Sequence, residues 1–153
     1  MRVLSRICYA LRMKTREQNL LLSFASAWNR IERRLDSSLG AIRGISLAEY
    51  RLLRALADAP NSQASRVDLA HAVGLTPSGV TRALRPMEKL GVVTTIKSKR
   101  DARLALAALS PSGRELVEDA STVVDDAMQD FLSRSLKVNE NLDEMIGLLE
   151  DIR

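Results

Sequence analysis

The chain has 153 residues, which is enough for one domain with helical extensions and a modest core. It has no apolar run long enough to cross a bilayer, and its single cysteine excludes an intramolecular disulfide framework and fits a reducing cytoplasm. The net charge of +4 divides into +6 for residues 1–44, +5 for residues 45–110 and −7 for residues 111–153. We therefore expect a cytoplasmic protein whose basic middle segment suits a polyanion such as DNA, with no membrane partner.

The N-terminal part of the chain predicts one long helix. Residues 1–14 lack a signal-peptide cleavage pattern, and the sequence leaves open whether they extend this helix. Residues 16–39 predict an amphipathic helix with a coiled-coil-like seam, because apolar residues recur at alternating spacings of three and four: Leu21, Phe24, Trp28, Ile31 and Leu35. Gly40 and Gly44 are expected to end this helix.

A second helix is predicted from Ser46 to about Ala59. Ser46 and Glu49 form a capping-box-like start, and Pro60 and Asn61 close the helix. The residues expected to face inward are Tyr50, Leu53, Leu56 and Ala57.

Two further helices joined by a tight turn follow. Ser65 and Asp68 form another capping-box-like start, and Gly74 ends that helix because glycine adopts the left-handed conformation at little cost. Thr76 caps the next helix and Pro77 is its first residue, where the missing N–H costs nothing. The expected apolar faces comprise Val67, Leu69, Ala70 and Val73 in the first helix, and Val80, Ala83, Leu84, Met87 and Leu90 in the second. This pattern predicts a helix-turn-helix, whose second helix enters the major groove of DNA.

The first turn of the second helix carries small or hydrogen-bonding residues, namely Ser78, Gly79, Thr81 and Arg82. Such a turn suits close approach to base edges and phosphates, with backbone N–H groups facing anions. The two hydroxyl residues and the arginine are the candidates for base-edge and nearby phosphate contacts, and the alternative is ordinary exposed helix surface. Pro86 is expected to kink or break the helix, which affects the direction of Arg85 and Lys89.

After Gly91 the apolar pattern changes to that of strands. Residues 92–96 are β-branched, residues 104–109 are apolar, and the basic segment 97–103 lies between them. The two runs predict a hairpin with a long basic tip, and a helix-turn-helix followed by such a hairpin is a winged helix. The alternative for the basic segment is a solvated turn.

The C-terminal part predicts the longest helix and one shorter helix. Ser110 and Pro111 repeat the cap-then-proline signature, and a break is expected near residues 137–139. The apolar stripes are Leu116, Ala120, Val123, Val124, Ala127, Phe131 and Leu132 in the longer helix, and Leu142, Met145, Ile146, Leu149 and Ile152 in the last one. The first and last helices carry more apolar surface than a small winged helix needs, which usually marks an interface.

The run LTPSGVTRALRPMEKLGVV, followed by RDAR and then LSPSGRELVEDA, resembles the MarR (multiple-antibiotic-resistance regulator) family of bacterial winged-helix transcription factors. Asp101 and Arg103 match the Asp-x-Arg of the family's wing, and Leu109, Ser110 and Gly113 match the Leu-Thr-x-x-Gly that follows it. The resemblance covers roughly residue 20 to the C-terminus. It implies a mainly α-helical fold with a small β-hairpin wing. Residues 45–110 would form the winged helix-turn-helix domain, and residues 1–44 and 111–153 would supply the dimerisation helices.

The same resemblance implies a homodimer that binds a pseudo-palindromic operator in double-stranded DNA. It implies a transcriptional regulator, a repressor relieved by a small-molecule effector that the sequence does not identify. The wing would reach the minor groove, with Asp101 orienting Arg103 through an ion pair. The candidate DNA-binding residues are Ser65, Thr76, Pro77, Ser78, Gly79, Thr81, Arg82, Arg85, Lys97, Lys99, Arg100, Asp101 and Arg103.

Two alternatives remain: a winged helix used for contact with proteins, and a nonspecific DNA-binding protein. No nucleophile elbow, phosphate loop or dinucleotide fingerprint is present, so neither enzymatic activity nor a cofactor is expected. His71 and Cys8 lie too far apart in the sequence to suggest a metal site. Cys8 is interpreted as a free thiol rather than a redox sensor, because no second cysteine can resolve a sulfenic acid within the chain.

Overall fold

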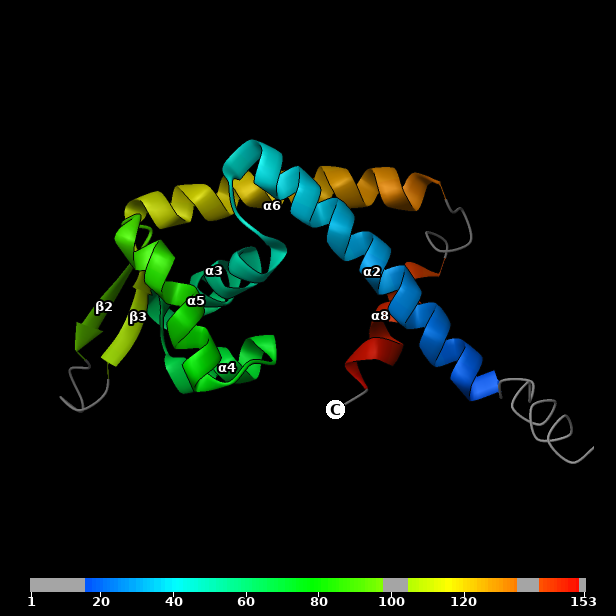
Figure 1. Ribbon diagram of the computed structural model, residues 1–153, viewed down its shortest axis with the longest axis horizontal. Coiled ribbons are helices and arrows are strands. Elements are labelled where there is room, and N and C mark those ends of the chain that lie inside the picture. Colours follow the sequence, from blue (N-terminus) through cyan, green and yellow to red (C-terminus); the bar gives the residue numbers. More distant parts are fainter. Residues whose placement is uncertain (1–15, 98–104, 135–140, 152–153) are drawn as a thin grey trace, which may run out of the picture. The chain divides into compact units, whose positions relative to one another are not determined.

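The computed structural model describes residues 16–97, 105–134 and 141–151. It divides into two units between Arg34 and Leu35, a boundary that the first described helix, α2 (Arg16–Arg43), crosses. The other elements all belong to the second unit (Figure 1): α3 (Leu47–Asp58), η1 (Pro60–Ser62), β1 (Gln63–Ser65), α4 (Arg66–Val73), α5 (Pro77–Lys89), β2 (Val93–Lys97), β3 (Ala105–Leu109), α6 (Pro111–Ser133) and α8 (Leu142–Glu150). The fold is the expected winged helix-turn-helix with additional helices.

Helix α2 is longer than the sequence predicts. It continues through Gly40 and ends at Arg43, where Gly44 has a left-handed φ of 67°. The expectation for Gly44 is confirmed and that for Gly40 is wrong, because a single glycine inside a helix costs only about 0.5–1 kcal/mol relative to alanine. Leu35 and Leu39, which precede Gly40 in the same helix, are buried in the second unit, and their burial offsets that cost.

The first unit leaves apolar side chains of α2 in solvent. They include Leu20, Leu21, Leu22, Phe24 and Trp28, of which Leu20 is 72% exposed and Trp28 41% exposed. Leu21, Phe24 and Trp28 belong to the predicted apolar seam, and none of the described residues of the first unit, 16–34, buries them.

Helix α3 begins as predicted. The Ser46 hydroxyl accepts a hydrogen bond from the Glu49 N–H at 3.2 Å, and the Ser46 N–H donates to Glu49 Oε2 at 2.8 Å, which completes the capping box. The Leu47 N–H donates to Asp36 Oδ1 of α2 at 2.6 Å, so a second carboxylate stabilises this helix start. Leu52, Leu53 and Leu56 are fully buried in the core, where α3 packs against α4 and α6.

The helix-turn-helix buries one face of each of its helices. Leu69, Ala70 and Val73 of α4 are buried, as are Val80, Leu84 and Met87 of α5. Two predicted inward residues are wrong, because Val67 is 52% exposed and Leu90 is 76% exposed. Val67 lies in the first turn of a helix of only eight residues, and Leu90 follows the last residue of α5. Both lie at a helix end, beyond the part of the apolar face that is buried.

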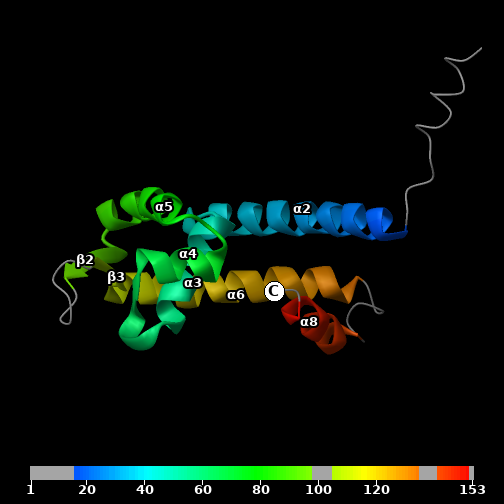
Figure 2. The same ribbon diagram turned by 90° about the horizontal axis from the view of Figure 1, so that it is seen from below.

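The wing is built on three antiparallel strands in the order β1-β3-β2. The predicted hairpin is confirmed, with Val93 paired to Leu109 and Thr95 paired to Ala107. The third strand, β1, was not predicted. Its three residues are QAS, which carry no strand periodicity, and they pair through Gln63 with Ala108 of β3. The sheet lies at the C-terminal end of α5 (Figures 1 and 2).

Helix α6 also begins as predicted, and its first turn packs closely against Val92, just before β2, and Leu109, the last residue of β3. The Ser110 hydroxyl accepts from the Gly113 N–H at 3.0 Å and donates to the Val92 carbonyl at 3.0 Å. Gly113 is buried, and a Cβ atom there would overlap the Val92 carbonyl oxygen. Further along α6, Ala120 and Ala127 of the predicted stripe are buried.

Candidate nucleic-acid interface

The turn between α4 and α5 brings the predicted DNA-reading tip to the surface. Gly74 has φ 71° and ψ 33°, and its N–H bonds to the Ala70 carbonyl, which ends α4. The Leu75 N–H bonds to the same carbonyl at 2.9 Å. The chain then extends at Thr76 and enters α5, and Thr76, Pro77 and Ser78 are all exposed.

The tip is ordered by its own hydroxyl groups. The Thr76 Oγ1 accepts from the Gly79 N–H at 3.1 Å and lies 3.1 Å from the Ser78 Oγ. The Thr81 hydroxyl donates to the Pro77 carbonyl at 2.9 Å, so it can offer a ligand only its acceptor lone pairs and its methyl group. Gly79 is favoured in this turn, since a Cβ there would lie 3.2 Å from Thr76 Oγ1.

Fewer backbone donors face outward than the sequence suggests. Pro77 has no N–H, the Gly79 N–H is capped by Thr76, and the Val80 N–H bonds to the Thr76 carbonyl at 2.9 Å. In the first turn of α5, therefore, the Ser78 N–H is the remaining donor without a capping or helical partner among the described contacts. The tip presents one amide and several hydroxyl groups rather than a row of amides.

Beyond the tip, basic side chains follow the exposed face of α5. Ser78, Arg82 and Arg85 lie at positions i, i+4 and i+7, which share one face of a helix, opposite the buried Val80 and Leu84. Arg82 and Arg85 are both exposed, and neither forms an ion pair within the described part of the chain. Two guanidinium groups are thus free to meet an anion.

Pro86 does not break this helix. The sequence predicts a kink or a break at Pro86. Helix α5 is continuous from Pro77 to Lys89, so a break is wrong, and a kink remains a prediction. Pro86 cannot donate to the Arg82 carbonyl, but both residues are exposed, and water can satisfy that carbonyl. Arg85 consequently stays in helical register with the tip.

The remaining predicted site residues divide into two groups. Ser65 caps α4, because its hydroxyl accepts from the Asp68 N–H at 3.1 Å and donates to Asp68 Oδ2 at 2.7 Å. The wing-tip residues lie outside the described residues, as does the side chain of Lys97, although the backbone of Lys97 ends β2. The wing-tip residues in question are Lys99, Arg100, Asp101 and Arg103.

Sequence reasoning missed one polar cluster beside this surface. Arg66, Glu88 and Thr95 meet between α4, α5 and β2, although they are up to 29 residues apart in the chain. No local pattern joins residues at such separations, so only the fold could reveal the cluster.

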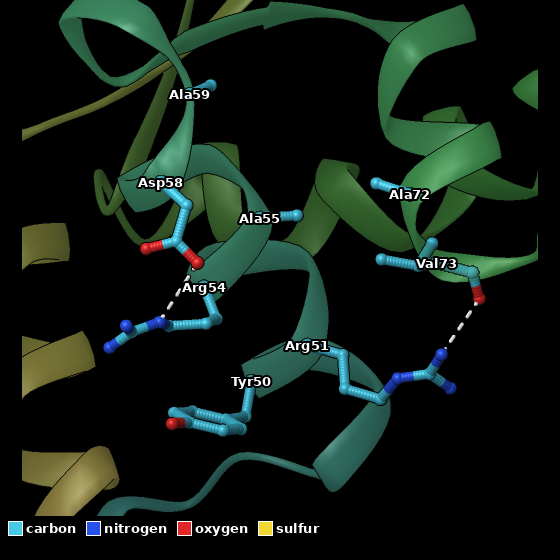
Figure 3. Close-up of a pocket in the computed structure, with 8 residues that line it drawn as sticks. All are labelled: Tyr50, Arg51, Arg54, Ala55, Asp58, Ala59, Ala72 and Val73. Carbon is cyan, nitrogen blue, oxygen red and sulfur yellow. Dashed lines mark hydrogen bonds and ion pairs between the residues drawn. The ribbon is translucent and has the colours of Figure 1, made fainter. Parts of the chain in front are cut away.

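A shallow cleft of about 420 Å³ lies between α3 and α4 (Figure 3). Arg51 reaches across it and donates to the Val73 carbonyl at 3.1 Å, while Arg54 pairs with Asp58 at 3.1 Å on the other side. Tyr50 lines the cleft and its hydroxyl lies 3.1 Å from the Ser121 Oγ of α6. The polar groups lining the cleft thus have partners within the protein.

In the described part of the chain, no group of three or more metal-binding side chains occurs, and no helix is long and apolar enough to cross a membrane.

Comparison with known proteins agrees with this geometry. Residues 43–104 match the model of the MarR family. The chain is 31% identical over 93 residues to YdgJ of Bacillus subtilis (strain 168), described as an uncharacterized HTH-type transcriptional regulator, and this match spans 61% of the chain and 56% of that relative. The chain thus covers little more than half the length of this relative.

Two solved structures have a similar fold over most of their length. Sco3205 of Streptomyces coelicolor, a MarR family transcriptional regulator solved in complex with DNA, is 25% identical, with a TM-score of 0.77 over 92% of this chain and 90% of that one. The transcriptional regulator BldR of Sulfolobus solfataricus is also 25% identical, with a TM-score of 0.76 over 92% of this chain and 100% of that one.

Proposed function

We propose that this chain is a winged-helix transcriptional regulator of the MarR type rather than an enzyme, and that it binds operator DNA and represses transcription. Residues 43–104 match the MarR family model, and the fold is similar to that of a MarR family regulator solved in complex with DNA. The observation that carries the proposal is the exposed first turn of α5, where Ser78 and Arg82 share a face that the protein leaves uncovered. A bidentate contact between arginine and guanine is the commonest specific contact in the major groove.

The charges of the winged-helix segment support a polyanionic partner. Residues 45–110 carry ten Lys/Arg and five Asp/Glu, and two of those acidic residues, Asp58 and Glu88, are paired with arginines within the fold. Basic side chains that meet phosphates release counterions, so binding must weaken steeply with salt. We propose that several residues position the protein on the DNA backbone without reading bases, namely Thr76, Pro77, Gly79, Thr81 and Ser65. The wing tip is proposed to contact phosphates and the minor groove.

The proposed active form is a homodimer. Exposed apolar side chains of α2 in the first unit, and Met145, Ile146 and Leu148 of α8 in the second, are the surfaces that a second copy would cover. Two-fold symmetry would place two α5 tips about 34 Å apart, one turn of DNA, on a pseudo-palindromic operator. An effector that changes this spacing would relieve repression by shifting the population of DNA-competent dimers.

The proposal is tested by the binding of purified full-length protein to duplex DNA. We expect a mobility shift at low salt that weakens as salt rises, with a slope of log Kobs against log [salt] of about −0.9 per phosphate contacted. A protein-contact module would give no shift at low salt. A nonspecific DNA-binding protein would shift all duplexes equally.

A further inference from the structure

Four residues from four elements meet where the wing joins the helix-turn-helix. Arg66 is the first residue of α4, Glu88 lies near the end of α5, Thr95 lies in the middle of β2, and Ala105 begins β3. Arg66 Nη2 lies 3.4 Å from Glu88 Oε1 and donates to Thr95 Oγ1 at 3.1 Å, and Arg66 Nη1 donates to the Ala105 carbonyl at 3.4 Å. The Thr95 hydroxyl donates to Glu88 Oε1 at 2.5 Å, which closes the network.

The Arg66–Glu88 ion pair at the centre of the network is partly buried, whereas its hydrogen bonds to Thr95 and to the Ala105 carbonyl are exposed. The side chains of Arg66 and Glu88 are only 23% and 29% exposed, whereas those of the i,i+4 pair Arg54–Asp58 are 52% and 61% exposed. An exposed ion pair contributes little to stability, but a partly buried, hydrogen-bonded network holds its members more firmly.

The position of the network gives it a mechanical consequence. Ala105 pairs with Lys97 at the end of the β2–β3 ladder, and Lys97 is the first residue of the basic segment 97–103. Arg66 thus ties both strands of the hairpin to the start of α4, and Glu88 ties β2 to the end of α5, the helix that carries the DNA-reading tip.

We propose that Arg66 and Glu88 are positioning residues that fix the wing against α5, so that the wing and the α5 tip contact one DNA duplex together. The inference rests on the proposed function, and neither residue need contact a base for it to hold. It assigns Glu88 a role opposite to that of its charge: an isolated carboxylate in a basic, DNA-facing segment repels phosphates, whereas a carboxylate that anchors the wing promotes binding.

The two roles predict opposite signs for one substitution. Glu88→Met removes a negative charge and the acceptor for Arg66 and Thr95. If charge alone mattered, binding would tighten. If Glu88 positions the wing, binding should weaken about five- to tenfold, and the salt slope should become shallower by about 0.9 for each phosphate that the wing no longer touches.

The matched control is Asp58→Asn, which removes the same charge from an ion pair contained within α3. It should bind as wild type or slightly tighter. Thr95→Val changes no charge and should weaken binding in the same direction as Glu88→Met, while Glu88→Gln, which keeps an acceptor oxygen, should be intermediate. Tighter binding by Glu88→Met, or wild-type binding by Thr95→Val, would overturn the inference.

Hydrogen exchange of the free protein tests the anchoring without DNA. We expect faster exchange of β2 and β3 amides in Glu88→Met and Thr95→Val than in Asp58→Asn, with the amides of α3 unchanged in all three. Unchanged exchange in the strands would overturn the inference even if Glu88→Met and Thr95→Val both weakened DNA binding. Absence of any DNA shift by the wild type would instead refute the proposed function. The exchange rates of β2 and β3 alone would then show whether Arg66 and Glu88 anchor the wing to α5.

Discussion

Arg82 occupies the position at which a single side chain should most affect sequence recognition. It is exposed, one helical turn beyond Ser78, and has no ion pair among the described residues. We expect Arg82→Ala to lose about 1–3 kcal/mol of discrimination between operator and random duplex, because that is the value of one bidentate contact to guanine.

The measurement is a pair of binding titrations, with operator and with random duplex, at one salt concentration. Arg54→Ala, in an exposed pair of α3, is the control for loss of one positive charge. An equal loss of affinity for both duplexes in Arg82→Ala would mean that Arg82 contacts only phosphate.

Gly113 is the glycine whose replacement should most affect stability. Its Cβ would overlap the Val92 carbonyl oxygen and lie 3.0 Å from a Leu109 methyl carbon, and both neighbours belong to the packed wing. We expect Gly113→Ala to lower the free energy of unfolding by about 1–3 kcal/mol, the usual cost of overpacking a core.

Gly40→Ala is the matched control, since a Cβ at this helical position meets nothing within 4 Å. Thermal or urea unfolding should show this variant to be more stable than wild type by about 0.5–1 kcal/mol, because alanine favours the helix. If Gly113→Ala were equally benign, the close packing of the first turn of α6 against Val92 and Leu109 would be refuted.

At the scale of single elements, the cap of α5 links stability to recognition. Thr76 satisfies the Gly79 N–H and holds the Ser78 hydroxyl at 3.1 Å. We expect Thr76→Ala to cost about 0.5–2 kcal/mol of stability, the range for loss of an N-cap, and to weaken operator binding as well. Thr76→Ser retains the capping oxygen and should restore most of both, as measured by urea unfolding and by operator titration.

Helix boundaries were predictable from the sequence where they depend on local chemistry. Ser46, Thr76 and Ser110 cap helices as predicted. Each cap is a hydrogen bond from a backbone N–H to a side-chain oxygen only three residues earlier, so the local sequence is enough to predict it. Gly74 likewise ends α4 in the left-handed conformation. The tip of the candidate site, from Thr76 to Arg82, could therefore be located without coordinates.

The features that the sequence did not predict depend on tertiary contacts. Strand β1 exists because β3 offers it a free edge, and its own residues show no strand pattern. Pro86 is tolerated because it and Arg82 are exposed. Leu90 is exposed because α5 ends at Lys89, so Leu90 no longer lies on the buried face of the helix. The Arg66 network joins residues that no periodicity relates.

At the scale of the whole molecule, the exposed apolar surface of α2 is the surface that the proposed dimer would bury. Leu20 and Leu21 are 72% and 66% exposed, and burying a leucine side chain contributes about 1.5–3 kcal/mol. We expect analytical ultracentrifugation to show a stable dimer at micromolar concentration, and Leu21→Glu to dissociate it while the winged helix stays folded. A wild-type monomer at that concentration would contradict the proposed assembly.

In the proposed dimer, two α5 tips read one duplex. Selection of bound duplexes from a random pool by the full-length protein tests this most directly. We expect an inverted repeat whose half-site centres are about 10–10.5 base pairs apart, the spacing of successive major grooves on one side of DNA. Recovery of unrelated sequences, or of a single half-site without its symmetric mate, would contradict paired reading by the two tips.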